Sequence, residues 1–220
     1  MDRRKALRSM GLAMGYTVAT PTLISLMQSC KGEPVLEWTP DFFSKEQGGV
    51  LTTLVDIILP KTDTPSASEV QVNLFIDRFA NEVMDKEQQD FFKMTMDRFV
   101  GKALKDGGKE KATDLAAEDL EKTLAAALKV TKDDQIQMFE TINSYNEAIA
   151  KGETATLEDN IAHFAFANNL RGMTIWGYKT SEFVGEEVLE YLPVPGEYIP
   201  CGDLQELPGG KDWSIEGNGN

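Results

Sequence analysis

Few side chains in this 220-residue chain could perform acid–base, nucleophilic or metal chemistry. The chain holds one histidine, His163, and two cysteines, Cys30 and Cys201. A closed zinc site uses four ligands, mostly Cys and His, and most iron–sulfur clusters use four cysteines. The chain has too few Cys and His residues for either kind of site. Neither cysteine belongs to the Cys-x-x-Cys-His sequence that attaches haem covalently. We therefore predict no metal site in this chain.

Catalysis by the chain alone would have to use His163 as a general base and a carboxylate as the acid. His163 lies among Phe and Ala residues in a segment with helical periodicity, which is more typical of a structural histidine. Paired acids such as Asp133–Asp134 and Glu186–Glu187 are abundant, and most such pairs form solvated faces. The Gly-x-Ser-x-Gly, Gly-x-Gly-x-x-Gly and phosphate-loop patterns are absent. We therefore predict no catalytic residue and no cofactor-binding residue.

The net charge changes sign along the chain. The whole sequence carries 22 Lys and Arg against 36 Asp and Glu, a formal net charge of −14. In residues 1–29 four basic residues face only Asp2, so this segment carries +3 and the remainder −17. Binding to nucleic acid needs a surplus of Lys and Arg, so the acidic body argues against a nucleic-acid partner. A basic start before an acidic body predicts a targeting peptide.

Residues 1–29 have the features of an export signal. Arg3 and Arg4 precede an uncharged and mildly apolar run from Ser9 to Ser29. The arginine pair resembles the twin-arginine signal, which exports proteins already folded, although the Ser and Phe of that signal are missing. An ordinary secretory signal is the alternative. The run is too weakly apolar to predict a transmembrane helix.

The same run ends at a cysteine that could carry lipid. The sequence Leu26–Cys30 resembles a lipobox, in which the cysteine is acylated and becomes the mature N-terminus. Acyl chains would then anchor the protein to a membrane. The alternative is a disulfide bond between Cys30 and Cys201. We expect lipid attachment at Cys30 and an exported protein, held in the periplasm or cell envelope.

The chain after residue 43 shows helical periodicity of apolar residues. Capping pairs are expected at Ser44 with Gln47, Ser66 with Glu69, Asp85 with Gln88, and Thr156 with Asp159. Seven helices are expected. They run from Ser44 to Pro60, from Ser66 through Val72–Val83, from Asp85 to Gly107, around Leu120–Leu128, around Ile136–Ile149, from Thr156 to Tyr178, and from Ser181 to Leu189. We therefore predict an all-α single domain of about six to seven helices over residues 44–191, after an anchor and linker at residues 30–43.

Residues 192–220 break this pattern, because Pro and Gly recur too often for a helix to continue. The segment nevertheless contains more apolar residues, such as Tyr198, Leu204 and Trp213, than a tail free in solvent would have. We predict an irregular C-terminal arm that packs on this protein or on a partner.

Four stretches of the chain share the motifs of one known family. They are Asp56–Ala67, Phe75–Asp77, Thr174–Glu182 and Pro193–Tyr198 followed by Cys201. Together they resemble the gluconate 2-dehydrogenase subunit 3 family over most of residues 38–205. Lys179, where an aromatic residue is common, is a small departure. None of these motifs is by itself a pattern typical of a catalytic site.

The resemblance implies a small, non-catalytic accessory subunit of a membrane-associated dehydrogenase for sugars or polyols. In such complexes a large subunit of the glucose–methanol–choline class binds FAD and oxidises the substrate, and a cytochrome c subunit with haem c often accepts the electrons. The small subunit commonly brings the twin-arginine signal, so that its folded, FAD-loaded partner is exported with it. The alternative is a stand-alone helical lipoprotein that acts as a binding or scaffold module.

Two segments are expected to contact the partner, because aromatic residues commonly dominate the centre of an interface. The alternative is that both segments pack within the chain. The expected contact residues are Trp176, Gly177, Tyr178, Thr180, Ser181 and Glu182 in the first segment, and Tyr198, Cys201 and Leu204 in the second.

Overall fold

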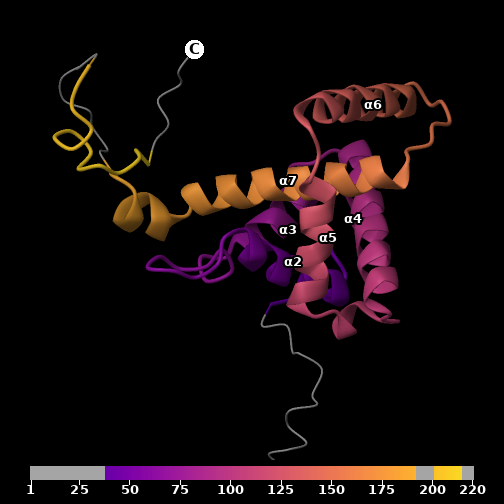
Figure 1. The fold of residues 1–220 in the computed structure, drawn as a ribbon, viewed down its shortest axis with the longest axis horizontal. Helices are drawn as coiled ribbons and strands as arrows, with labels where there is room; N and C mark the ends of the chain where they lie inside the picture. The colour runs from indigo at the N-terminus through magenta and orange to yellow at the C-terminus, as the bar shows by residue number, and fades with distance from the viewer. Residues whose placement is uncertain (1–37, 192–200, 215–220) are drawn as a thin grey trace, which may run out of the picture. The chain divides into compact units, whose positions relative to one another are not determined.

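A computed structural model describes residues 38–191 and 201–214, and the predicted Arg3, Arg4, Cys30 and Tyr198 sites lie outside these residues. In chain order the helices are α2 (Lys45–Ile58), α3 (Val72–Glu82), α4 (Lys86–Gly107), the short 3₁₀ helix η1 (Ala112–Asp114), α5 (Ala117–Leu128), α6 (Lys132–Ala150), α7 (Asp159–Lys179) and the π-helix η2 (Val184–Val188) (Figure 1). The described residues contain no strand, only an isolated bridge between Glu190 and Trp213. The all-α prediction is confirmed.

Two of the predicted capping pairs form as expected. At the start of α2, Ser44 Oγ accepts a hydrogen bond from the Gln47 backbone N–H (3.2 Å), and Gln47 Oε1 accepts one from the Ser44 N–H (3.0 Å). Asp85 and Gln88 make the same reciprocal pair at the start of α4, at 2.8 and 3.1 Å. Each pair satisfies amide groups that the first turn of a helix leaves without a partner.

Two other predicted caps are wrong. Ser66 and Glu69 do bond to each other, but they close a turn, and α3 begins only at Val72. Gln71, which has a left-handed backbone (φ 62°), separates this turn from α3. The Asp56 carboxylate accepts hydrogen bonds from the backbone and hydroxyl of Ser68 (2.8 and 2.6 Å) and so holds the turn in place.

The second wrong cap is at Thr156. Helix α7 starts after Glu158, which makes no side-chain cap. The start is set instead by contacts with α4: Leu157 is buried, and its carbonyl accepts a hydrogen bond from Arg98 (2.6 Å).

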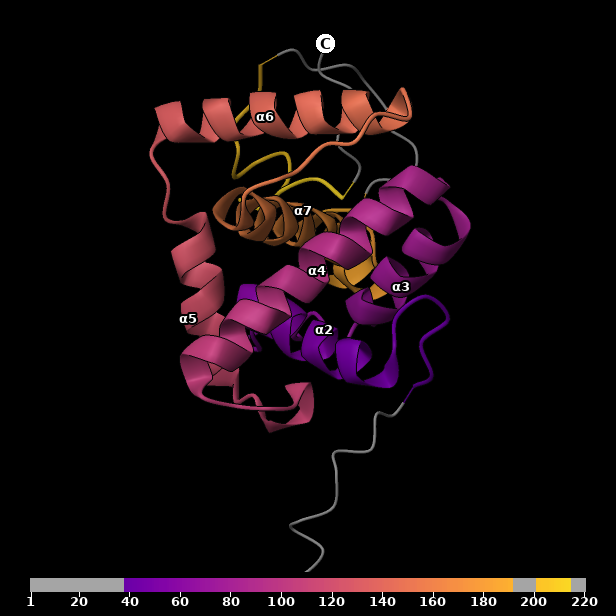
Figure 2. The same cartoon turned by 90° about the vertical axis from the view of Figure 1, so that its right-hand side faces the viewer.

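The core surrounds α7, which contacts each of the α-helices α2 to α6 and also η2. Phe166 of α7 packs against Phe92 and Phe99 of α4, with ring centroids 5.9 and 4.9 Å apart. All three rings are buried, and each stabilises the fold by about 1.5–3 kcal/mol through removal from water. Figure 2 shows α4 crossing in front of α7.

Helix α6 is the least anchored α-helix in the structure. It lies along one side of α7 in both views, and Ile142 is its only buried residue (Figures 1 and 2). Phe139 adds an edge-to-face contact with Phe164 of α7 at 5.4 Å. None of the helices in residues 38–191 and 201–214 is long and apolar enough to span a bilayer.

The described end of the predicted linker packs on the body. Phe42 and Phe43 are 8% and 5% exposed and belong to the main core. Asp77 of α3, which is 1% exposed, accepts hydrogen bonds from the backbone N–H groups of Asp41, Phe42 and Phe43 at 2.7, 3.1 and 3.0 Å. This carboxylate therefore fixes the path by which the chain reaches α2.

Candidate functional site

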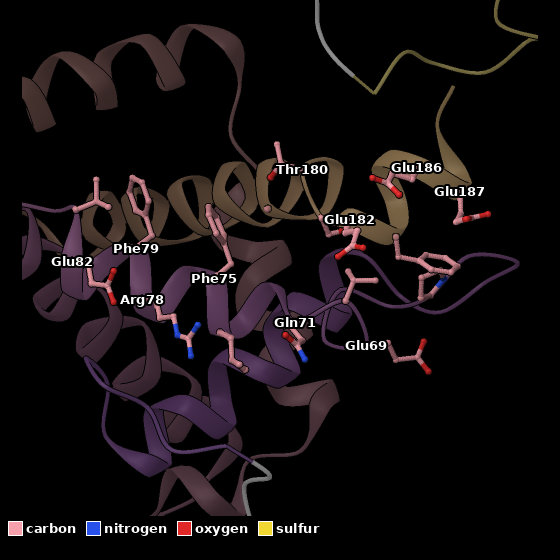
Figure 3. A pocket seen from close by; sticks show the side chains of 17 residues that line it. Glu69, Gln71, Phe75, Arg78, Phe79, Glu82, Thr180, Glu182, Glu186 and Glu187 are labelled. Atoms are coloured by element: carbon pink, nitrogen blue, oxygen red, sulfur yellow. The ribbon is translucent and has the colours of Figure 1, made fainter. Parts of the chain in front are cut away.

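An apolar groove of about 980 Å³ lies between α3 and the turn that joins α7 to η2. Its apolar lining includes Phe75, Phe79 and Val83 from α3 and its C-terminal end, and Phe183 from the start of η2. Figure 3 shows Phe75 and Phe79 rising from α3 towards α7. Val83 and Phe183 are 63% and 51% exposed, so the groove leaves much apolar surface in contact with water.

One wall of the groove depends on a close approach between α3 and α7 at Gly177. A Cβ atom at Gly177 would lie 2.6 Å from Phe75 Cδ1 and 3.3 Å from Val72 Cγ1. No real side-chain carbon tolerates the first distance, so only glycine lets the two helices meet here. The Phe75 ring therefore lies directly against α7 at Gly177.

Trp176 covers the outer side of these rings. Its indole meets Phe75 and Phe79 edge to face, with centroids 4.9 and 5.3 Å apart. Such pairs contribute about 0.5–1.5 kcal/mol beyond area burial. Trp176 is still 47% exposed, so one side of the indole remains free to contact another molecule.

The opposite wall is a π-helix, a rare form that often marks functional positions. In η2 the Leu189 N–H reaches the Val184 carbonyl (2.9 Å), five residues earlier. Val184 is 1% exposed and anchors the turn in the core. Glu186 and Glu187, on the exposed side, line the groove together with Glu182 (Figure 3).

The charged lining of the groove is mostly acidic. It consists of Glu69, Glu82, Glu182, Glu186 and Glu187, with Arg78 as its basic member. Glu69 forms an ion pair with Lys61, whose hydrogen bond lowers the pKa of the Glu69 carboxyl below its ordinary value. The other four carboxylates take part in no ion pair within the described part of the chain.

The structure joins two motifs that lie far apart in the sequence. Tyr178, in the segment 174–182, donates a hydrogen bond to the Pro65 carbonyl (2.8 Å) and lies 3.1 Å from Thr64 Oγ1. Both partners belong to the segment 56–67. The two motifs therefore form one continuous surface that includes the groove.

The predicted contact residues of the first segment have different positions. Trp176, Thr180 and Glu182 are exposed. Gly177 is buried against Phe75, and Tyr178 and Ser181 are half-buried and use their hydroxyl groups within the chain. Gly177, Thr180, Ser181 and Glu182 line the groove.

The described residues of the second predicted segment, Cys201 and Leu204, do not line the groove. Cys201 and Leu204 are exposed, and Cys201 forms no disulfide within the described residues. The end of this segment bonds back to the body, because Glu190 pairs with Trp213, and Asp212 forms an ion pair with Lys179 at 2.9 Å. The structure thus does not bring Cys201 and Leu204 into the groove that the first segment lines.

Of the lining residues, sequence reasoning predicted only Gly177, Thr180, Ser181 and Glu182 as contact residues. The residues that it missed include Arg78, Phe79, Glu82 and Val83 at α3, and Phe183, Glu186 and Glu187 at η2. Phe183 directly follows the motif that ends at Glu182, which is a local signal that could have included it. The others require knowledge of how α3 packs on α7, and no short pattern carries that information.

His163 occupies a structural position on another side of the molecule. Its Nε2 lies 3.2 Å from the Arg98 carbonyl oxygen, which can only accept, so Nε2 carries the proton. Burial lowers the pKa of His163 below its usual value, although this hydrogen bond and Asp159 oppose the shift. Within residues 38–191 and 201–214, no three His, Cys, Asp or Glu side chains are grouped to hold a metal ion.

Comparison with known proteins gives one match. A family model described as gluconate 2-dehydrogenase subunit 3 matches residues 45–196, more than half of the chain. The matched range contains every helix from α2 to η2 and all the groove residues. Neither the curated proteins nor the solved structures yield a match.

Proposed function

The chain belongs to the gluconate 2-dehydrogenase subunit 3 family, and from this premise we propose that it is the non-catalytic small subunit of a FAD-dependent sugar or glycoside dehydrogenase. The proposed partner is a large subunit of the glucose–methanol–choline class, which binds FAD and carries out the oxidation. A cytochrome c subunit is a further candidate partner. The small subunit would stabilise the large one, accompany it during export and tether it to a membrane.

The observation that carries this proposal is the apolar groove on the surface formed by the two joined motifs. Trp176, Phe183 and Val83 are each between 47% and 63% exposed on or beside it. Contiguous apolar surface of this kind commonly marks an interaction site, and buried aromatic residues contribute most of the binding energy at interface centres. A partner that covers the groove would remove this surface from water.

The sequence of residues 1–30 supports the proposed export and tethering. The Arg3–Arg4 pair resembles a signal for folded cargo, which suits a partner that must acquire FAD before export. Acylation of Cys30 would then hold the complex at a membrane, since each buried methylene contributes about 0.8 kcal/mol.

Affinity purification of the full chain from its native host, under native conditions, tests the partnership. The expected result is a yellow complex that contains a flavin-dependent dehydrogenase subunit. Trp176→Ala should reduce the amount of dehydrogenase recovered, whereas Ile136→Ala, which truncates a 50% exposed residue on α6, should not. A colourless chain purified without a dehydrogenase would contradict the proposal and favour the stand-alone lipoprotein.

Two further variants test the N-terminal segment. Replacement of both arginines, Arg3→Lys with Arg4→Lys, should leave the chain and its dehydrogenase in the cytoplasm. Cys30→Ser should release the exported complex from the membrane fraction. Normal membrane association of the Cys30→Ser variant would contradict the proposed lipid anchor.

A further inference from the structure

We propose that the groove between α3 and η2 receives an amphipathic helix of the dehydrogenase subunit, one whose apolar face is flanked by Lys and Arg on the η2 side. This inference rests on the proposed function, because it names what part of the partner is bound. Three properties of the groove support it: an apolar lining, helical walls without a strand edge, and an uneven distribution of charge.

The apolar lining of the groove favours a partner element with an apolar face. Phe75, Phe79 and Val83 come from one wall and Phe183 from the other, so a guest lying between the walls would contact apolar side chains on both sides. Helix-in-groove recognition uses side chains spaced three and four residues apart in this way. The lining therefore favours an element with a continuous apolar stripe.

The walls determine the secondary structure of the guest. Both α3 and η2 are helices, so neither offers a strand edge with which an extended peptide could pair. A guest that leaves water for this groove must pair its own N–H and C=O groups, because unpaired polar groups are costly to bury. A helix meets this requirement, and an extended segment does not.

The charged residues that line the groove indicate which charges flank the apolar face of the bound helix. On the η2 side, Glu182, Glu186 and Glu187 point into or beside the groove, and none of them has an ion-pair partner within the described residues (Figure 3). On the α3 side, Arg78 lies among the lining residues close to Glu82. The complementary helix carries Lys or Arg towards η2 and tolerates an acidic residue towards Arg78.

A second copy of this chain is a poorer occupant. The part of the chain after residue 29 carries a net charge of −17, so a copy would bring further negative charge to an acidic groove. Like charges placed opposite each other oppose association, whereas a basic flank would be attracted during the encounter.

Photo-cross-linking in the intact complex tests the inference directly. The photoreactive residue p-benzoylphenylalanine replaces Phe183 in the full chain, the complex is isolated from the native host and irradiated, and the linked peptides are identified by mass spectrometry. The expected product joins position 183 to a dehydrogenase peptide with apolar residues at helical spacing and Lys or Arg beside them. The same replacement at Ile136 on α6 serves as the control and should not link to that peptide.

Charge reversal provides the second test. Glu186→Lys with Glu187→Lys should weaken retention of the dehydrogenase about tenfold at low salt and less at 1 M salt, because salt screens such contacts. The matched control, Glu121→Lys with Glu140→Lys, makes the same change in net charge at exposed positions of α5 and α6 and should leave retention unchanged.

The two proposals fail in different ways. If no dehydrogenase accompanies the chain, the proposed function is wrong. If the dehydrogenase is present but position 183 links to another copy of this chain, to the chain itself, or to a dehydrogenase loop without basic residues, only the helix inference is overturned. Equal retention of the reversal pair and its control would likewise overturn it.

Discussion

The Tyr178 hydroxyl donates a hydrogen bond to the carbonyl oxygen of Pro65, 2.8 Å away, across 113 positions of sequence. This bond connects the end of α7 to the loop between α2 and α3. Asp56 holds the other end of the same loop through Ser68. The loop is therefore fixed at Pro65 and at Ser68. The bond at Pro65 comes from α7, the helix that packs on α3 beside the groove.

Tyr178→Phe should loosen this loop without unfolding the body. Loss of one hydroxyl hydrogen bond typically costs about 1 kcal/mol. We expect faster hydrogen exchange of backbone amides in residues 61–66, with only a small change in the overall free energy of unfolding. Tyr145→Phe is the control, because no hydrogen bond of the Tyr145 hydroxyl is present among the described residues. Equal exchange in both variants would contradict the role of Tyr178.

Gly177→Ala should destabilise the protein by about 1–2 kcal/mol, because overpacking costs about 1–3 kcal/mol and the better helix propensity of Ala returns part of it. The added methyl group would meet the Phe75 ring, which Trp176 and Phe79 hold in place. Gly172→Ala is a matched control on the same helix, since nothing lies within 4 Å of its Cβ position. Urea denaturation should show a small gain in stability for Gly172→Ala. A gain for Gly177→Ala would show that α3 does not press on α7.

Asp77→Asn keeps the shape of the side chain but should destabilise the body by about 1–3 kcal/mol, the cost of an unmatched buried polar group. One amide oxygen can still accept from Phe42 and Phe43, but the amide nitrogen would face the N–H of Asp41. The midpoint of urea denaturation measures the loss. Asp63→Asn, an exposed change in the loop, should leave the midpoint unchanged.

The half-buried His163 should make the protein less stable in mild acid. Burial lowers the pKa of its imidazole below 6.5, so the unfolded chain takes up a proton before the folded chain does. The His163 contribution is therefore complete above the unfolded pKa and is lost as the pH falls through the folded pKa. The free energy of unfolding should fall more between pH 7.5 and 5 for the native chain than for His163→Gln. Titration of His163 by NMR at a pKa above 6.5 would contradict this prediction.

Local patterns predicted the helices well and their tertiary contacts poorly. The Ser44 and Asp85 capping boxes and the Gly107–Gly108 ending of α4 depend on residues within one turn, and all are confirmed. Helix α3 starts only after the left-handed Gln71, and the start of α7 contacts Arg98, which is 59 positions from Leu157. A capping pattern cannot report such contacts, so the predicted starts at Ser66 and Thr156 were wrong.

The groove shows the same limit. The segment 174–182 was identifiable from its motif, and the packing of Trp176 on Phe75 was not, because α3 and α7 are almost one hundred residues apart. The sequence could indicate Phe75 and Trp176 separately but not that Gly177 brings them together.

If Cys30 carries lipid, as proposed, the attachment of Trp38 and Asp41 to the body limits the distance between the protein and the membrane. Trp38, the first described residue, lies eight positions after Cys30 and donates a hydrogen bond to Thr52 of α2. A fully extended chain spans at most about 3.6 Å per residue, so a lipid-bearing Cys30 would lie at most about 30 Å from Trp38. The groove and any subunit held in it would then stay close to the membrane surface, and a flexible insertion before Trp38 would extend that reach in a controlled way.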